Sequence, residues 1–206
     1  MPQNKLEAIA AKIRSYFATE DEAREKALPL CRQVIRNSAN AIKAIHRQEQ
    51  KEAGQILAAT HKLVRRLNAV LGDHPALLNS GFVHDAQKEF AEGSVTLALI
   101  SGKRLPSPEA LDVDPAAYLN GLGEAVGELR RYLLDSMRRG DFSRCEELLQ
   151  AMDDIYNTLM TMDFTEIITH GLRRTTDAIR GIIERTRGDV TLSLRQKELE
   201  TKLGKG

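Results

Sequence analysis

The sequence has no tryptophan, and aromatic residues make up only 4% of its 206 positions. Prolines number six and glycines 14, and neither an internal repeat nor a low-complexity tract is present. A chain so poor in aromatic residues must build its core from aliphatic side chains, which is typical of helical proteins. No segment shows sustained period-two alternation of apolar and polar residues, so the sequence predicts no strand.

Cysteines and long hydrophobic runs are also scarce. Cys31 and Cys145 are far apart and fit no metal or redox spacing, so we expect free thiols in a reducing compartment. No apolar run approaches the ~20 residues of a membrane span, and the N-terminal segment MPQNKLEAIAAK has no signal-peptide core. We therefore expect a soluble, cytoplasmic protein that does not bind a membrane.

The apolar residues that are present recur with helical periodicity. They make up 42% of the chain and charged residues 29%, which is the composition of a globular domain. The pattern predicts an all-α bundle in which residues 1–188 form one domain and residues 189–206 a charged tail that could be helical. We expect seven helices, at about 4–17, 21–50, 53–71, 75–101, 115–139, 141–162 and 165–187.

Residues 102–114 form the clearest predicted loop. Ser107 and Pro108 are the residue types that begin a short helical turn. Asp114 followed by Pro115 is a cap and first-turn signature, and it predicts the start of the next long helix at this point.

Acidic residues gather in the segment Gly81–Gly93. At about 100° per residue, Asp85, Glu89 and Glu92 fall in one narrow sector of the predicted helix. Glu89 lies at the edge of the apolar stripe of that helix. A carboxylate in such a place is either half-buried and paired, or a ligand.

Glu124 and Glu128 lie one turn apart on a later helix. Together with Glu89 and Glu92 they could hold a hard divalent cation, Mg²⁺ or alternatively Mn²⁺, because such ions prefer carboxylates and water. The competing interpretation is an ordinary solvent-facing pair, since Glu124 and Glu128 lie opposite the apolar stripe of their helix. The absence of a Glu-x-x-His motif disfavours a di-iron site.

Three glycines, Gly121, Gly123 and Gly127, interrupt the same helix. Their spacing, and the lack of a preceding strand, exclude a dinucleotide-binding loop. Each glycine costs helix stability relative to alanine, so we expect them to allow another helix or a ligand to approach closely.

The net charge of +1 conceals a basic and an acidic region. Residues 31–70 contain eight Lys and Arg against two Glu, whereas residues 141–170 contain one Arg against seven Asp and Glu. One helix face in the basic region carries a line of cations that suits the phosphates of an extended polyanion. These cations are Arg32, Arg36, Lys43 and Arg47. The alternative is a solvated charged face, and no interleaved aromatic residues indicate base stacking.

Several segments, taken in order, resemble the translin/Trax family. QKEFAEG (Gln87–Gly93) is similar to the Glu-aromatic-x-Glu segment of Trax, and DPAAYLNGLGEAVGELRR (Asp114–Arg131) resembles the Y-L-x-G…G-E-L segment of translin and Trax. RRGDFSRCEELLQAMDDIYNTL and RTTDAIRGIIERT resemble the helices that follow in the family. The resemblance covers about residues 24–187 and is that of a compact archaeal or other prokaryotic, Trax-like member.

The resemblance implies a seven-helix translin-like bundle, assembly into a hollow oligomer that is commonly an octamer, and binding of single-stranded RNA or DNA. Trax is a metal-dependent endoribonuclease, whereas translin lacks the acidic site and mainly binds nucleic acid. Glu89 and Glu92 match the two Trax glutamates, and Glu128 matches the glutamate of G-E-L. Glu124 departs from the pattern, because Trax has an aspartate there.

We therefore expect an Mg²⁺-dependent endoribonuclease that cleaves single-stranded RNA as a homo-oligomer. The four glutamates would bind the metal that activates the attacking water, and the line of cations would hold the RNA backbone. The first alternative is a non-catalytic, translin-like protein that binds single-stranded RNA or DNA. The presence of the four glutamates is the feature that distinguishes the nuclease from this alternative. The second is a structural helical scaffold, which leaves the line of cations unexplained.

Overall fold

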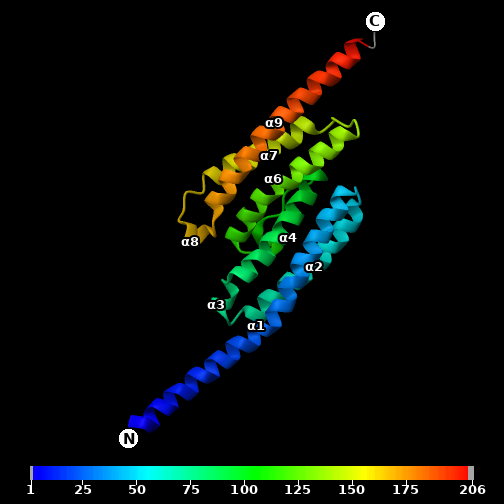
Figure 1. Ribbon diagram of the computed structural model, residues 1–206. Coiled ribbons are helices and arrows are strands. Elements are labelled where there is room, and N and C mark those ends of the chain that lie inside the picture. Colours follow the sequence, from blue (N-terminus) through cyan, green and yellow to red (C-terminus); the bar gives the residue numbers. More distant parts are fainter. Residues whose placement is uncertain (1, 204–206) are drawn as a thin grey trace.

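The chain folds into a bundle of long helices with short connections (Figure 1). A computed structural model describes residues 2–203, and every regular element in that range is a helix, which confirms the all-α prediction. The long helices are α1 (Pro2–His46), α2 (Gln50–Leu71), α4 (Gly81–Ile100), α6 (Pro115–Arg138), α7 (Cys145–Met160) and α9 (Leu172–Leu203). Three helices of four residues complete the bundle: α3 (Pro75–Leu78), α5 (Pro108–Leu111) and α8 (Glu166–Thr169).

Helix α1 is longer than the sequence predicted. We expected a break near residues 18–20, but this segment contains neither glycine nor proline, and the helix continues through it. Pro29 also lies inside α1 without ending it. The two helices predicted before residue 50 are therefore one helix of 45 residues.

The last predicted helix is divided instead. His170 and Gly171 adopt left-handed backbone conformations, with φ values of 49° and 83°, and they separate α8 from α9. Such a conformation is strained for most residues but not for glycine, which explains why the break falls at Gly171. Helix α9 then runs through Gly188, so the charged segment after residue 188 continues the helix as far as Leu203.

Both capping predictions for the loop after α4 are confirmed. Ser107 Oγ accepts a hydrogen bond from the backbone nitrogen of Ala110 at 3.2 Å, at the start of α5. Asp114 Oδ1 accepts from the nitrogens of Ala116 and Ala117 at 2.8 and 3.3 Å, at the start of α6. These bonds satisfy N–H groups that have no partner within the first helical turn.

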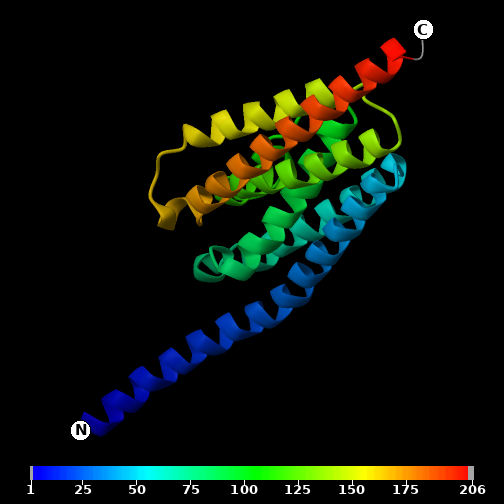
Figure 2. The same ribbon diagram turned by 45° about the horizontal axis from the view of Figure 1, so that its top comes forward.

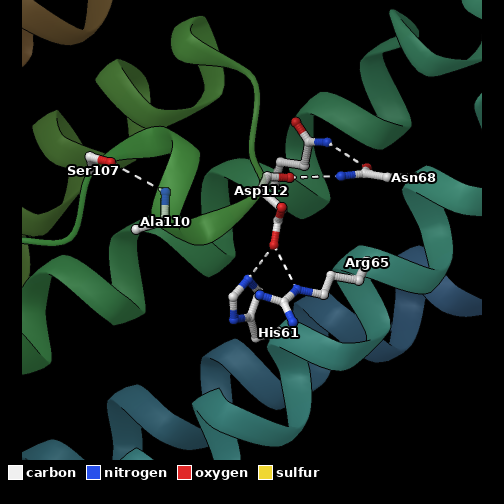
Figure 3. A network of polar contacts seen from close by, with 7 residues as sticks. His61, Arg65, Asn68, Ser107, Ala110 and Asp112 are labelled. Atoms are coloured by element: carbon white, nitrogen blue, oxygen red, sulfur yellow. Dashed lines mark hydrogen bonds and ion pairs between the residues drawn. The ribbon is translucent and has the colours of Figure 1, made fainter.

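A polar network attaches this loop to α2 (Figure 3). The Oδ2 atom of Asp112 accepts hydrogen bonds from Arg65 Nε at 2.7 Å and from His61 Nε2 at 2.8 Å. Asn68 Nδ2 donates to the backbone carbonyl of Asp112 at 2.7 Å. The bond from Arg65, followed by that from His61, lowers the pKa of Asp112. The network holds the end of the loop, and hence the start of α6, against α2.

Helix α4 is the central element of the bundle. It packs against α1 and α2 on one side and against α6 on the other, while α6 also packs against α7 and α9. All residues from Phe90 to Thr96 are buried, including Glu92. The sequence indicated a single apolar stripe on this helix, but α6 covers the second face as well.

Glycines of α6 allow the close helix contacts that the sequence predicted. A Cβ at Gly121 would lie 2.6 Å from the carbonyl oxygen of Lys88 in α4. A Cβ at Gly123 would lie 2.5 Å from Cγ2 of Thr175 in α9. Real side chains do not reach such distances, so each glycine lets a neighbouring helix approach the α6 backbone.

The first turns of α1 project from the body of the bundle (Figures 1 and 2). We call residues 5–20 the α1 arm. Large apolar side chains recur along it at the spacing of one helix face, with exposed fractions between 48% and 67%. They are Leu6, Ile9, Ile13, Tyr16 and Phe17. Within residues 2–203, no helix combines the length and the apolar character needed to cross a membrane.

Candidate metal centre and nucleic-acid interface

Three of the four predicted glutamates meet between α4 and α6. Glu89 and Glu92 of α4 and Glu124 of α6 each offer a carboxylate oxygen, and these oxygens lie within 4.8 Å of one another. Glu92 is only 8% exposed, while the other two are half-buried. The helix contact at Gly121 brings the two elements close enough for this arrangement. We call the three residues the acidic cluster.

Burial and mutual repulsion raise pKa values in the acidic cluster. Burial, and then the charges of Glu124, Glu89 and Glu128, raise the pKa of Glu92 to about 8. The pKa of Glu89 is also raised, by burial first and by Glu124 next. A bound cation would reverse both effects, because it replaces the lost hydration and offsets the repulsion between the carboxylates.

Lys88 contacts the acidic cluster from α4. Its Nζ donates a hydrogen bond to Oε1 of Glu124 at 2.7 Å. Burial lowers the pKa of Lys88, but the bond to Glu124 and the surrounding carboxylates outweigh it and raise the pKa overall. Sequence reasoning gave Lys88 no role. Its position next to Glu89, in QKEF, is the signal that could have indicated one.

Glu128 lies outside the acidic cluster. Its carboxylate accepts a hydrogen bond from Nε2 of His46, at the end of α1, and one of its oxygens lies 4.0 Å from Arg131. The charge of Glu128 still contributes to the raised pKa of Glu92. Direct metal binding by Glu128 stays a prediction. The position of its carboxylate favours a supporting role, in which it acts on the cluster through its charge.

Arg32, Arg36 and Lys43 of the predicted line of cations lie on the exposed face of α1, and Arg47 is exposed in the turn just after the helix ends. Arg47 Nε donates to Glu49 at 2.5 Å, and another nitrogen of Arg47 lies 4.0 Å from Glu52. Within the described part of the chain, no carboxylate pairs with the other three cations. They are Arg32, Arg36 and Lys43. The contact between His46 and Glu128 joins this helix to the helix that carries part of the acidic cluster.

A groove adjoins the acidic cluster between α6 and α9. It has a volume of about 470 Å³, and Glu92 and Glu124 form part of its wall. Arg174 of α9 lies beside the same groove and is exposed. Sequence reasoning missed Arg174, because no spacing in the sequence relates α9 to the acidic residues.

No family model matches the chain. An uncharacterized protein of Methanocaldococcus jannaschii is 31% identical over 191 residues, which covers 92% of this chain and 84% of that protein.

Solved structures share the fold over nearly the whole chain. AfC3PO is 34% identical, with a TM-score of 0.84, over 90% of this chain and 96% of that chain. A structure of AfC3PO in complex with duplex RNA is 33% identical, with a TM-score of 0.82, over 90% of this chain and 96% of that chain. Apo-NeC3PO, at 21% identity, has the same fold with a TM-score of 0.78 over 88% of this chain and 95% of that chain. The segments around Glu89 and Glu124, the shared helical fold and the identity to AfC3PO together show that the chain belongs to the translin/Trax family.

Proposed function

We propose that the protein is an endoribonuclease that cleaves single-stranded RNA and depends on Mg²⁺, with Mn²⁺ as an alternative ion. The acidic cluster carries the proposal. Its carboxylate oxygens come from two helices and lie within 4.8 Å of one another, and one of its members is 8% exposed. Carboxylates this close and this buried are costly as anions unless a cation offsets their charge.

The donor set fits a hard divalent cation. Glu89, Glu92 and Glu124 supply oxygen ligands only, and the two half-buried members leave room for water or a substrate phosphate. When bound, Mg²⁺ would supply Lewis-acid chemistry that offsets the negative charge of the phosphodiester. Because the pKa of Glu92 is about 8, metal binding would release a proton at neutral pH.

The surrounding residues position the substrate. Lys88 is the cation nearest the acidic cluster in sequence, and its ammonium group could transfer its hydrogen bond from Glu124 to a phosphate oxygen. His46 holds Glu128 and so fixes a further negative charge beside the ligands. Arg32, Arg36 and Lys43 would bind the RNA backbone through its phosphates, which gives affinity without sequence preference.

Binding of nucleic acid is proposed for this chain partly from its relative. AfC3PO has been solved with duplex RNA, and this chain is 33% identical to it over 90% of its length. Duplex RNA is therefore a second ligand to test beside single-stranded RNA and DNA. We propose the single strand as the form that is cleaved.

Assembly into a homo-oligomer is the second part of the proposal. The α1 arm exposes apolar side chains along one face, and monomeric proteins rarely leave such a row uncovered. A second copy of the chain is the proposed partner, and the family resemblance favours a hollow octamer. The line of cations and the acidic cluster would then face an enclosed interior.

The alternative is a translin-like protein that binds nucleic acid without cleaving it. The contact of Lys88 with Glu124 favours this alternative, because the ammonium group already offsets part of the charge of the acidic cluster. Labelled single-stranded RNA and duplex RNA, incubated with the purified protein in Mg²⁺ and in EDTA, decide between the two. We expect cleavage of the single strand in Mg²⁺ alone. Binding without cleavage in both solutions would leave the non-catalytic reading.

A further inference from the structure

We propose that the groove between α6 and α9 receives one nucleoside of the RNA, next to the phosphodiester that is cleaved. The proposal rests on the nuclease function, because Glu92 and Glu124 form part of the groove wall. The volume of about 470 Å³ lies within the range of roughly 300–1,000 Å³ that small-molecule sites occupy. A nucleoside held there would have its phosphate beside the acidic cluster.

Glycine and aliphatic side chains form the inner surface of the groove. Gly123 lets α9 approach at Thr175, whereas at Gly127, one turn later, a Cβ would meet no atom within 4 Å. Ala178 and Ile182 of α9 line the space that Gly127 leaves open. Such a slot can accept the flat face of any nucleobase, because apolar side chains pack against the face and do not read its edge.

Ionisable side chains also line this slot. Glu92 is more than nine-tenths buried, lines the groove and accepts no side-chain or backbone hydrogen bond within residues 5–203. Arg174 also lines the groove, and none of the described carboxylates pairs with it. Its guanidinium is therefore available to a nucleotide phosphate, for which its planar fork of donors is well suited.

The groove offers few groups that could distinguish one base from another. Thr175 Oγ1 donates its proton to Oδ1 of Asn120 at 2.9 Å, so that hydroxyl is already used as a donor. Apart from this threonine and from Glu92, Glu124 and Arg174, the other residues that line the groove are glycine, alanine and isoleucine. We therefore expect all four nucleosides to bind with similar affinity. A base must leave its stack and its pair to enter, which favours single-stranded over duplex RNA as the cleaved form.

Filling the groove without touching a carboxylate tests the proposal. Gly127→Leu places a side chain where a Cβ meets nothing, so the fold should accept it. Gly188→Leu is the matched control, because Gly188 is also a helical glycine with no atom within 4 Å of its Cβ position, and it does not line the groove. Both changes replace glycine by a better helix former. Arg174→Ala removes the proposed phosphate contact.

The probe is 2-aminopurine riboside 5′-monophosphate, whose fluorescence reports the surroundings of the base. It is titrated into the full-length protein in EDTA, and Mn²⁺ binding is measured separately by calorimetry. We expect Gly127→Leu to weaken nucleotide binding at least about tenfold and Mn²⁺ binding less than about twofold. Gly188→Leu should match the parent protein. Arg174→Ala should weaken binding of the monophosphate more than binding of the unphosphorylated riboside.

Cleavage of single-stranded RNA separates this proposal from the nuclease proposal on which it rests. Gly127→Leu should lose RNA cleavage while it keeps Mn²⁺ binding. If Gly127→Leu binds the nucleotide and cleaves RNA as the parent does, or if the parent shows no fluorescence change, the groove is not a nucleoside site. A third outcome is that the parent protein binds the nucleotide and Gly127→Leu does not, but the parent never cleaves RNA in Mg²⁺. In that case the groove assignment stands and the nuclease assignment fails.

Discussion

The Nζ atom of Lys88 lies 2.7 Å from Oε1 of Glu124, so the acidic cluster already has a cation on one side. On the proposal above, the ammonium group and a divalent ion would compete for the same carboxylate oxygens. Binding of the ion must therefore break this contact or take place around it, and the balance of charge at the site depends on Lys88 as well as on the ligands.

Lys88→Met should tighten Mn²⁺ binding, because it removes the competing charge and keeps the length of the side chain. Two unit charges about 4 Å apart near a protein surface interact by about 1–4 kcal/mol, so we expect an increase in affinity of about tenfold. Calorimetry on metal-free protein measures it. Lys51→Met is the control, because Lys51 is exposed and pairs with no carboxylate in the described part of the chain. Equal affinities of the two variants would contradict the competition.

Glu89→Gln and Glu92→Gln should each abolish RNA cleavage and preserve RNA binding. Each change keeps the shape of the side chain but removes the charge of a proposed metal ligand. The loss of negative charge near the RNA phosphates can strengthen RNA binding. Glu124→Gln should act in the same direction. Gel assays for cleavage and fluorescence anisotropy for binding measure the two properties separately.

Glu128→Gln is the informative comparison for these variants, because the carboxylate of Glu128 is held by His46 and lies outside the acidic cluster. We expect it to reduce cleavage less than Glu92→Gln does. Cleavage at the parent rate by both Glu89→Gln and Glu92→Gln would remove the acidic cluster as the active site and favour the non-catalytic binding protein.

Metal-free protein should lose stability as the pH rises from about 4.5 to about 8. In this window the Glu92 carboxyl of the unfolded chain has released its proton, while burial keeps it bound in the folded state, where the pKa is about 8. The free energy of unfolding should fall by at most about 1.4 kcal/mol per pH unit from this group. Urea unfolding at several pH values in EDTA measures the slope, and Glu92→Gln should flatten it. An unchanged slope in that variant would contradict the assignment.

RNA binding should weaken as the salt concentration rises, because the line of cations on α1 and in the turn after it would contact phosphates. Arg32→Ala or Arg36→Ala should weaken binding to all sequences alike and reduce the slope of log affinity against log salt by roughly 0.7 for a single strand. Arg47→Ala should have a smaller effect, because Glu49 already pairs with Arg47. Anisotropy titrations at several salt concentrations check this. A changed base preference with an unchanged slope would contradict phosphate contact.

Introducing charged residues into the apolar row of the α1 arm should lower the oligomeric mass. Ile9→Asp combined with Ile13→Asp places two charges in the exposed apolar row, where a partner copy would have to bury them. Light scattering at micromolar concentration measures the mass. Ala11→Asp is the control, because Ala11 lies on the opposite face of the same exposed helix. A parent protein that is itself monomeric would remove the oligomer from the proposal.

Features determined by neighbouring residues could be predicted from the sequence. Ser107 and Asp114 cap helices as their local patterns indicate, and Glu89 and Glu92 share a helix face because the spacing of three residues requires it. Helical spacing alone also proposed Glu124 as a ligand but left a solvent-facing position as the alternative, and the resemblance to the translin/Trax family favoured the ligand. Local rules and family motifs therefore identified the members of the acidic cluster.

Contacts between distant segments could not be predicted in this way. The bond from His46 to Glu128 joins residues 82 positions apart, and the contact of Lys88 with Glu124 depends on how closely α4 and α6 approach. That distance is determined by packing around Gly121, which no periodicity reveals. The prediction divided the continuous helix α1 near residue 20, because acidic residues such as Asp21 and Glu22 are also typical of the first turn of a helix.

The complete burial of α4 from Phe90 to Thr96 has a consequence for the time scale on which the site can change. Because every residue from Phe90 to Thr96 is buried, we expect hydrogen exchange of these backbone amides to require unfolding of the whole domain. No hinge or loop at this position can open to admit an ion. Entry of the proposed ion would therefore depend on side-chain motion at the half-buried Glu89 and Glu124. An ion bound at Glu92 would slow the global unfolding of the protein and not a local fluctuation.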